Sequence, residues 1–164
     1  QDETSRLADH LMLIEEGKII GNGPINEMLT RLDLPLSHSG DAISIFDARV
    51  MSRDTDFNLM HLEFKGGQFI VPDNKLPIES LVRIRVAARD VSITKKKQTD
   101  TSILNIFPAV VEEIVPEGDA QVMVRLTLKG VVLLACLTRK SASSLKLDQG
   151  LSVFIQVKSV AILS

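Results

Sequence analysis

The chain has 164 residues, a formal net charge of −2 and 45% apolar residues. That apolar content supports one ordinary domain or two small ones with a real core, and it excludes a disordered chain. The near-neutral charge and the lack of Trp and Tyr disfavour nucleic-acid binding, which needs clustered cations or aromatic stacking platforms. No apolar run approaches the ~20 residues that span a bilayer, and the first residues lack the order of a signal peptide. We therefore expect a cytoplasmic protein.

The cysteine and the histidines indicate neither a disulfide framework nor a metal site. Cys136 is the single cysteine and lies in an apolar run, 131–137, where a thiol is most simply a small core side chain. His10, His38 and His61 are isolated from one another and from Cys136. Because a transition metal needs several such ligands at close spacing, we expect no metal site.

The first 36 residues predict a small α/β unit. Residues 2–9 indicate a short helix that starts with acidic residues, and 10–14 with 18–21 indicate a hairpin. A second helix is predicted from Pro24 to Arg31, with the proline at the first helical position, where its missing N–H does no harm. These elements are too few to close a core, so they are expected to be the end of something larger.

Beyond a small-residue linker at 37–41 the pattern becomes all-strand and repeats itself. Three blocks recur in the same order: 45–50 with 106–111, 62–66 with 126–130, and 86–93 with 155–162. Each half is divided into short strands by Gly, Pro and Asp turns, which is typical of a small five-stranded Greek-key barrel of the OB type. The lysine-containing stretch at 94–100 is expected to be a solvated connector.

The predicted fold is therefore mainly β. Two tandem five-stranded OB-like barrels follow a short α/β remnant. The predicted units are 1–36 for the remnant, 42–94 for the first repeat and 101–164 for the second.

Side chains that can donate hydrogen bonds gather in the second repeat. They are Ser102, Asn105, Thr138, Ser141, Lys158 and Ser159. Hydroxyls, an amide and an ammonium, with the N–H groups of a short helix expected to begin near Ser141, suit an oxyanion. Each residue taken alone has a structural explanation: a helix cap for Ser141, turns for Ser102 and Asn105, and a solvated strand edge for Lys158. The serines have no His or carboxylate at short spacing, so nucleophilic catalysis is not expected.

Residues 7–29, LADHLMLIEEGKIIGNGPINEML, resemble the end of the nucleotide-binding domain of ABC transporter ATPases. No G-x-x-x-x-G-K-[ST] phosphate loop occurs in the sequence. The resemblance therefore implies that ATP and Mg are held only by a part of the parent chain outside this sequence. We expect no enzyme activity from this segment itself.

Residues 102–163 resemble the Mop domain, the molybdate-binding member of the transport-associated OB group. The matching motifs are S-x-x-N at 102–105, the block from Ala135 to Gly150, and V-x-x-x-x-K-S/A within 153–160. The resemblance implies that Ser102, Ser141, Lys158 and Ser159 contact molybdate or tungstate, the last largely through its backbone, with Thr138 and Asn105 in support. It also implies a homodimer, because in this family the site lies between neighbouring Mop domains.

This chain departs from the Mop pattern at two places. Many Mop domains carry arginine where this chain has Leu104, so weaker neutralisation of the anion's charge is expected unless Arg139 or Lys140 contributes. The first repeat has 89–90, Arg-Asp, in place of Lys158 and Ser159, and it lacks the T-x-x-S block. It is therefore expected to be a structural repeat without its own site.

Two hypotheses follow. The leading one is a regulatory, molybdate- or tungstate-binding domain of a molybdate importer's ATPase subunit, which also dimerises that subunit. It would act at the cytoplasmic membrane face with permease subunits as partners. The alternative is a dimerisation scaffold, without anion binding, in an importer of another solute such as a sugar or sulfate. A free-standing molybdate store or repressor would lack the ATPase-like residues 1–36.

Overall fold

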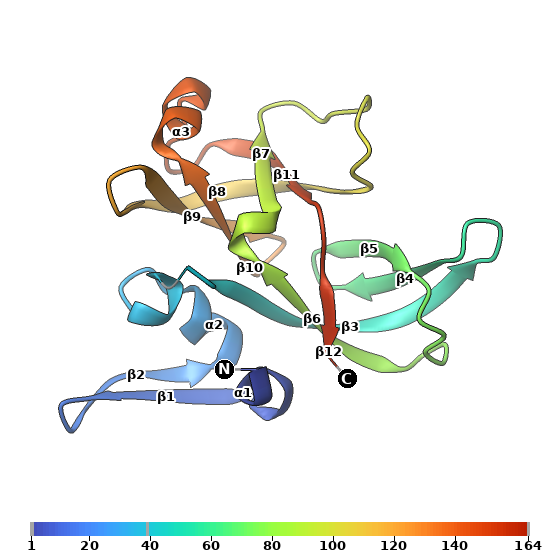
Figure 1. The fold of residues 1–164 in the computed structure, drawn as a ribbon, viewed down its shortest axis with the longest axis horizontal. Coiled ribbons are helices and arrows are strands. Elements are labelled where there is room, and N and C mark those ends of the chain that lie inside the picture. The colour runs from blue at the N-terminus through green and yellow to red at the C-terminus, as the bar shows by residue number, and fades with distance from the viewer. Residues whose placement is uncertain (1, 39, 164) are drawn as a thin grey trace.

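The fold is taken from a computed structural model that describes residues 2–38 and 40–163. Gln1 and Ser164, at the outer ends of the predicted units, and Ser39, in the predicted linker, lie outside the described residues. Within the described part there are two five-stranded sheets and one separate two-stranded sheet, joined by short helices (Figure 1). The prediction of a mainly β fold is confirmed.

The N-terminal segment is a hairpin between two short helices. Its elements are α1 (Asp2–Leu7), β1 (His10–Glu15), β2 (Lys18–Pro24) and α2 (Ile25–Thr30). The predicted hairpin is confirmed by antiparallel pairing from His10↔Pro24 to Glu15↔Lys18. The predicted start of the second helix is wrong by one residue. Pro24 is the last residue of β2 and the N-cap of the helix: its φ of −55° would suit a helix, but its ψ of 145° is extended, so the helix begins at Ile25.

The linker η1 (Pro35–His38) leads into two halves built alike. The first half contains β3 (Ile43–Asp54), β4 (Leu59–Phe64), β5 (Gly67–Pro72), β6 (Leu81–Ala87), the 3₁₀ turn η2 (Ala88–Asp90) and β7 (Val91–Thr94). The second contains β8 (Asn105–Glu117), β9 (Gln121–Leu128), β10 (Val131–Thr138), α3 (Arg139–Leu145), β11 (Ser152–Val157) and β12 (Ala161–Leu163). The repeated blocks of the sequence thus fall on equivalent strands.

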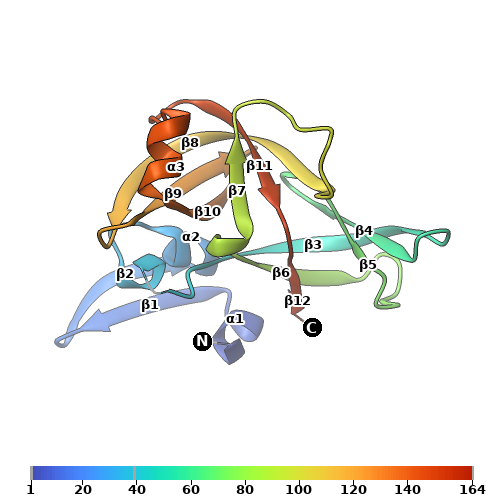
Figure 2. The same cartoon turned by 45° about the horizontal axis from the view of Figure 1, so that its top comes forward.

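The two halves exchange their last strands. One sheet has the order β10-β9-β8-β11-β7, and the other has the order β5-β4-β3-β6-β12. Both views show the chain passing from β6 up to β7 beside β11, and from β11 down to β12 beside β6 (Figures 1 and 2). A division at 42–94 and 101–164 stays a prediction; the sheets themselves each contain strands from both sides of it.

Both halves contribute to one hydrophobic core. Leu62 and Phe69 from the first half pack in the same buried cluster as Leu126 and Ile155 from the second. Phe107 of β8 makes an edge-on contact with Phe69, with ring centroids 5.0 Å apart. Because the halves share both sheets and core, we expect them to unfold as one cooperative unit.

Two polar side chains connect the halves at equivalent places. Ser44 and Asn105 each stand one residue before the first repeated block, and each bonds to the third strand of the other half. The Leu134 N–H donates to Ser44 Oγ at 3.0 Å. The Ile70 N–H donates to Asn105 Oδ1 at 2.7 Å, and Asn105 Nδ2 donates to the Ile70 carbonyl at 3.0 Å. The pseudosymmetry therefore extends from strand order to side-chain contacts.

His38 connects the linker to the far end of β8. Its Nδ1 lies 2.6 Å from Glu117 Oε2 and its Nε2 lies 2.6 Å from the Leu32 carbonyl oxygen. A neutral imidazole has one N–H, so only the imidazolium can donate to both oxygens. The Leu32 carbonyl, followed by the Glu117 carboxylate, raises the pKa of His38 above its ordinary value of 6.5.

This contact predicts a pH-dependent stability. Because the folded-state pKa of His38 is raised, its contribution to stability is complete at pH values below its ordinary pKa. That contribution is lost as the pH rises through the raised pKa. We expect His38→Gln to lower the free energy of unfolding by about 1 kcal/mol near pH 6, and by less at higher pH. Urea unfolding of both proteins across this range is the measurement. A deficit that stays constant with pH would contradict a charged His38.

Candidate functional site

Lys158 and Ser159 lie at the crossover between the two sheets. β11 ends at Val157 and β12 begins at Ala161, so the chain changes sheets at these residues. The Lys158 N–H donates to the Asp90 carbonyl oxygen at 2.9 Å. Ser159 Oγ donates to Asp90 Oδ2, also at 2.9 Å. Both side chains are exposed, which leaves the ammonium of Lys158 facing solvent.

Ser102 belongs to the same end of the second half. Val157 pairs with Asn105 at the start of β8, so the residues just before Asn105 lead up to the crossover. Ser102 is exposed, as is Leu104, whose exposed fraction is 60%. We call Ser102, Lys158 and Ser159 the lysine-end group.

Asn105 has a different position from the other predicted site residues. Its exposed fraction is 8%, and both ends of its amide bond to the backbone of Ile70 as described above. Both the oxygen and the nitrogen of the side-chain amide are therefore engaged in hydrogen bonds between the two halves. The contact assigns Asn105 a structural task that local sequence could not indicate.

Thr138 and Ser141 form a pair of hydroxyls at the start of α3. Thr138 is the N-cap, and its Oγ1 accepts the Ser141 N–H at 3.1 Å. Thr138 Oγ1 in turn donates to Ser141 Oγ at 2.9 Å. The expectation that the helix begins near Ser141 is therefore corrected by two residues, because Thr138 supplies the capping oxygen. Both side chains are exposed, and we call them the hydroxyl pair.

The hydroxyl pair and the lysine-end group lie at opposite ends of β8. Val157 pairs with Asn105 at one end of this strand, and Glu117 at its other end pairs with Gln121, which pairs with Thr138. β8 has 13 residues, and at about 3.3 Å per residue its path is roughly 40 Å long. One chain therefore brings Ser102, Lys158 and Ser159 towards one end but leaves Thr138 and Ser141 at the other.

The cations considered as substitutes for the missing arginine lie at the hydroxyl-pair end. Arg139 and Lys140 are the first residues of α3. Arg139 Nη1 donates to the Asp119 carbonyl at 2.9 Å, and Lys140 is exposed. Within one chain neither residue lies at the end where Leu104 stands.

Sequence reasoning missed Asp90 as a neighbour of the predicted site. The repeat had aligned 89–90 with Lys158 and Ser159. When two repeats are related by a pseudo-two-fold axis, equivalent residues that lie near the axis contact each other. Ser159 and Asp90 are equivalent in the repeat alignment and are hydrogen-bonded to each other. The alignment was thus a usable signal for spatial contact.

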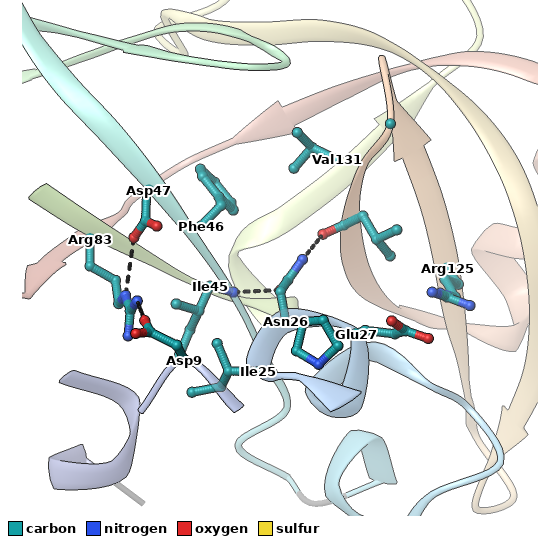
Figure 3. Close-up of a pocket in the computed structure, with 13 residues that line it drawn as sticks. Asp9, Ile25, Asn26, Glu27, Ile45, Phe46, Asp47, Arg83, Arg125 and Val131 are labelled. Atoms are coloured by element: carbon teal, nitrogen blue, oxygen red, sulfur yellow. Dashed lines mark hydrogen bonds and ion pairs between the residues drawn. The ribbon is translucent and has the colours of Figure 1, made fainter. Parts of the chain in front are cut away.

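A pocket lies elsewhere, between the N-terminal segment and both halves (Figure 3). Its volume is about 660 Å³, and Asn26, Asp47, Arg83 and Arg125 are among its lining residues. Asn26 accepts the Ile45 N–H at 2.7 Å and donates to the Val132 carbonyl at 3.1 Å, so α2 is bonded to both halves. None of the six predicted site residues is among the described residues that line it.

Arg83 links the N-terminal segment to the first half beside this pocket (Figure 3). Its Nη2 donates to Asp9 Oδ1 at 2.7 Å, and its Nε donates to Asp47 Oδ1 at 3.1 Å. Its Nη1 donates to the Ala8 carbonyl at 2.7 Å. These bonds explain why polar side chains line this pocket: they join the N-terminal segment to the first half.

In residues 2–38 and 40–163 no three His, Cys, Asp or Glu side chains are grouped so as to hold a metal ion. Over the same ranges no helix has the length and apolar character needed to cross a membrane.

The chain is similar along almost its whole length to molybdenum import ATP-binding proteins named ModC. It is 47% identical over 162 residues to that of Albidiferax ferrireducens, covering 99% of this chain and 44% of the relative. It is 43% identical over 163 residues to that of Methylococcus capsulatus, covering 99% of this chain and 46% of the relative. The predicted resemblance is confirmed. The chain spans less than half the length of these relatives, and it matches their C-terminal part.

The second half matches a known domain family, the TOBE domain, over residues 101–163. We call residues 101–163 the TOBE domain after this match. A solved structure titled as the cytoplasmic molybdate-binding protein ModG, with molybdate bound, has the same fold, with a TM-score of 0.63 and 21% identity. The match covers 73% of this chain and 94% of that chain. All six predicted site residues lie within the TOBE domain, at or near the ends of its strands.

Proposed function

We propose that this chain is the regulatory, oxyanion-binding part of the ATP-binding subunit of a molybdate importer, with molybdate or tungstate as its ligand. The similarity to ModC proteins over 99% of the chain supports the importer. The observation that carries the anion-binding part is the exposure of one ammonium and four hydroxyls at the two ends of the TOBE domain. A buried lysine or serine could not reach a ligand that arrives from solvent.

The proposed site is completed by a second copy of the chain. Ser102, Lys158 and Ser159 of one copy would face Thr138 and Ser141 of the other. The separation of the two groups along β8 supports this arrangement, because one chain leaves them at opposite ends of the strand. In a two-fold symmetric dimer the same pairing occurs twice, so the homodimer would contain two equivalent sites.

The donor set suits a tetrahedral dianion. Hydroxyl and N–H donors can each take one oxygen of the ligand, and hydrogen bonds that involve a charged partner are about twice as strong as neutral ones. Because Leu104 stands where many Mop domains have arginine, Lys158 is the cation of the lysine-end group. One ammonium facing two negative charges at an exposed site predicts binding that weakens as ionic strength rises.

Isothermal titration with sodium molybdate tests this function. We expect saturable heat with one molybdate per chain in the dimer. A folded dimer that gives no heat with molybdate at up to millimolar concentration would contradict the proposal. It would favour the alternative, in which the two halves only dimerise an importer ATPase for another solute.

The remaining parts of the proposal concern the parent protein. ATP and Mg would be bound by the part of the parent that precedes the ATPase-like segment, and permease subunits at the cytoplasmic face of the membrane would be its partners. This segment alone is expected to hydrolyse no ATP, because its sequence contains no phosphate loop. Ligand binding can regulate the parent only if the two states of the dimer differ in their affinity for the anion.

A further inference from the structure

An acidic side chain accepts a hydrogen bond from a hydroxyl group of the proposed anion site. Ser159 Oγ donates to Asp90 Oδ2 at 2.9 Å, and the Lys158 N–H donates to the carbonyl of the same residue at 2.9 Å. Asp90 is half-buried in η2, so its backbone is held while its carboxylate faces Ser159. The carboxylate therefore takes the side-chain donor that Ser159 could offer to an oxyanion.

The contact lies where ligands can reach it. Asp90 and Ser159 both line a pocket of about 160 Å³, together with Arg85 and Arg89. Ser159 is exposed, so the hydrogen bond to Asp90 can exchange for one to a solute. Asp90 is thus positioned to compete with an incoming anion.

The strand exchange gives this contact a second consequence. Asp90 directly precedes β7, and Ser159 lies two residues before β12. β7 and β12 are the two strands that the halves exchange. The Ser159–Asp90 bond therefore joins the two crossovers between the sheets.

We propose that Asp90 is an affinity-determining residue that acts as an internal competitor for the oxyanion, so that ligand binding requires Ser159 to exchange the Asp90 carboxylate for the ligand. This inference rests on the proposed function. It explains why a chain with the Mop-like donors would carry an anion beside them: the competitor raises the ligand concentration at which the site fills. When the ligand replaces Asp90, the Ser159–Asp90 hydrogen bond between the two crossovers is also broken. Ligand binding would thereby change a contact that joins the two sheets.

The size of the effect follows from the charges. A dianion held about 5 Å from a carboxylate in a water-like dielectric is repelled enough to weaken binding on the order of tenfold. Salt reduces this repulsion because the group is close to solvent. Removing the charge should therefore tighten binding most at low ionic strength.

The test is isothermal titration of the dimer with sodium molybdate, comparing the unsubstituted chain, called the parent chain, with Asp90→Asn. Asparagine keeps an acceptor for Ser159 but has no charge, so we expect binding to tighten on the order of tenfold at low salt and less at high salt. Asp90→Glu retains the charge and should leave affinity near that of the parent. Asp56→Asn removes a carboxylate from the exposed β3–β4 turn and is the charge-matched control, expected to change nothing.

The outcomes separate this inference from the proposed function. Tighter binding by Asp90→Asn alone supports the inference, and so does binding that appears in Asp90→Asn when the parent binds nothing. Unchanged or weaker binding by a folded Asp90→Asn, with a parent that binds, overturns the inference and leaves the proposed function standing. No binding by either protein overturns both. If Asp90→Asn does not fold, Asp90→Ser, which has the residue of the second half at this place, is measured in its stead with the same expectation.

Discussion

Replacing Lys158 with alanine is expected to weaken molybdate binding by about ten- to a hundredfold, because a charge-assisted hydrogen bond contributes about 1.5–3 kcal/mol. The side chain is exposed and its ammonium is the one positive charge of the lysine-end group, so the change removes charge balance without disturbing the core. Titration of the dimer with molybdate measures the loss, and thermal unfolding should show little change.

The matched control for Lys158→Ala is Lys18→Ala. Lys18 is also exposed, but it lies in the hairpin of the N-terminal segment, far along the chain from the TOBE domain. It should leave affinity unchanged. Equal affinities for the parent and Lys158→Ala would remove the main charge partner from the proposed site and would favour the scaffold function.

Replacing Asn105 with alanine is expected to lower the free energy of unfolding by about 2–3 kcal/mol, because both of its bonds to Ile70 are lost and the backbone groups of β5 lose their partners. The urea midpoint should fall in a single transition, since the halves share one core. Asn22→Ala, at an exposed position of β2, is the control and should change stability by less than about 0.5 kcal/mol.

Molybdate binding separates the structural task of Asn105 from a ligand-binding one. Where Asn105→Ala is still folded, its affinity should stay near that of the parent, because the amide is engaged at the junction of the halves. A large loss of affinity with little loss of stability would instead support the supporting role that the Mop resemblance implies for Asn105.

Local patterns predicted the elements, and long-range pairing decided what the sequence left open. The hairpin at 10–24, the repeated strands and the exposed connector follow from alternation and turn residues, which act over a few positions. The exchange of β7 and β12 does not, because both repeats have the same strand pattern and either sheet edge can accept a last strand.

The candidate site shows the same limit. The sequence predicted a helix that begins near Ser141, yet whether Thr138 or Ser141 is the cap depends on backbone geometry at the end of β10. The Mop resemblance implied that Asn105 supports the ligand, whereas its partner Ile70 lies 35 residues away in the sequence. The separation of the hydroxyl pair from the lysine-end group became visible only through the register of β8 with its neighbours.

Each proposed anion site is shared between two copies of the chain, and mixing two defective variants tests this sharing directly. Lys158→Ala and the double variant Thr138→Ala/Ser141→Ala each damage both sites of their own homodimer. In a mixed dimer one site carries both defects and the other carries none. After unfolding and refolding a 1:1 mixture, half of the dimers should be mixed, so about a quarter of all sites should bind molybdate with the affinity of the parent. A mixture that binds no better than the two variants apart would contradict a site shared between copies.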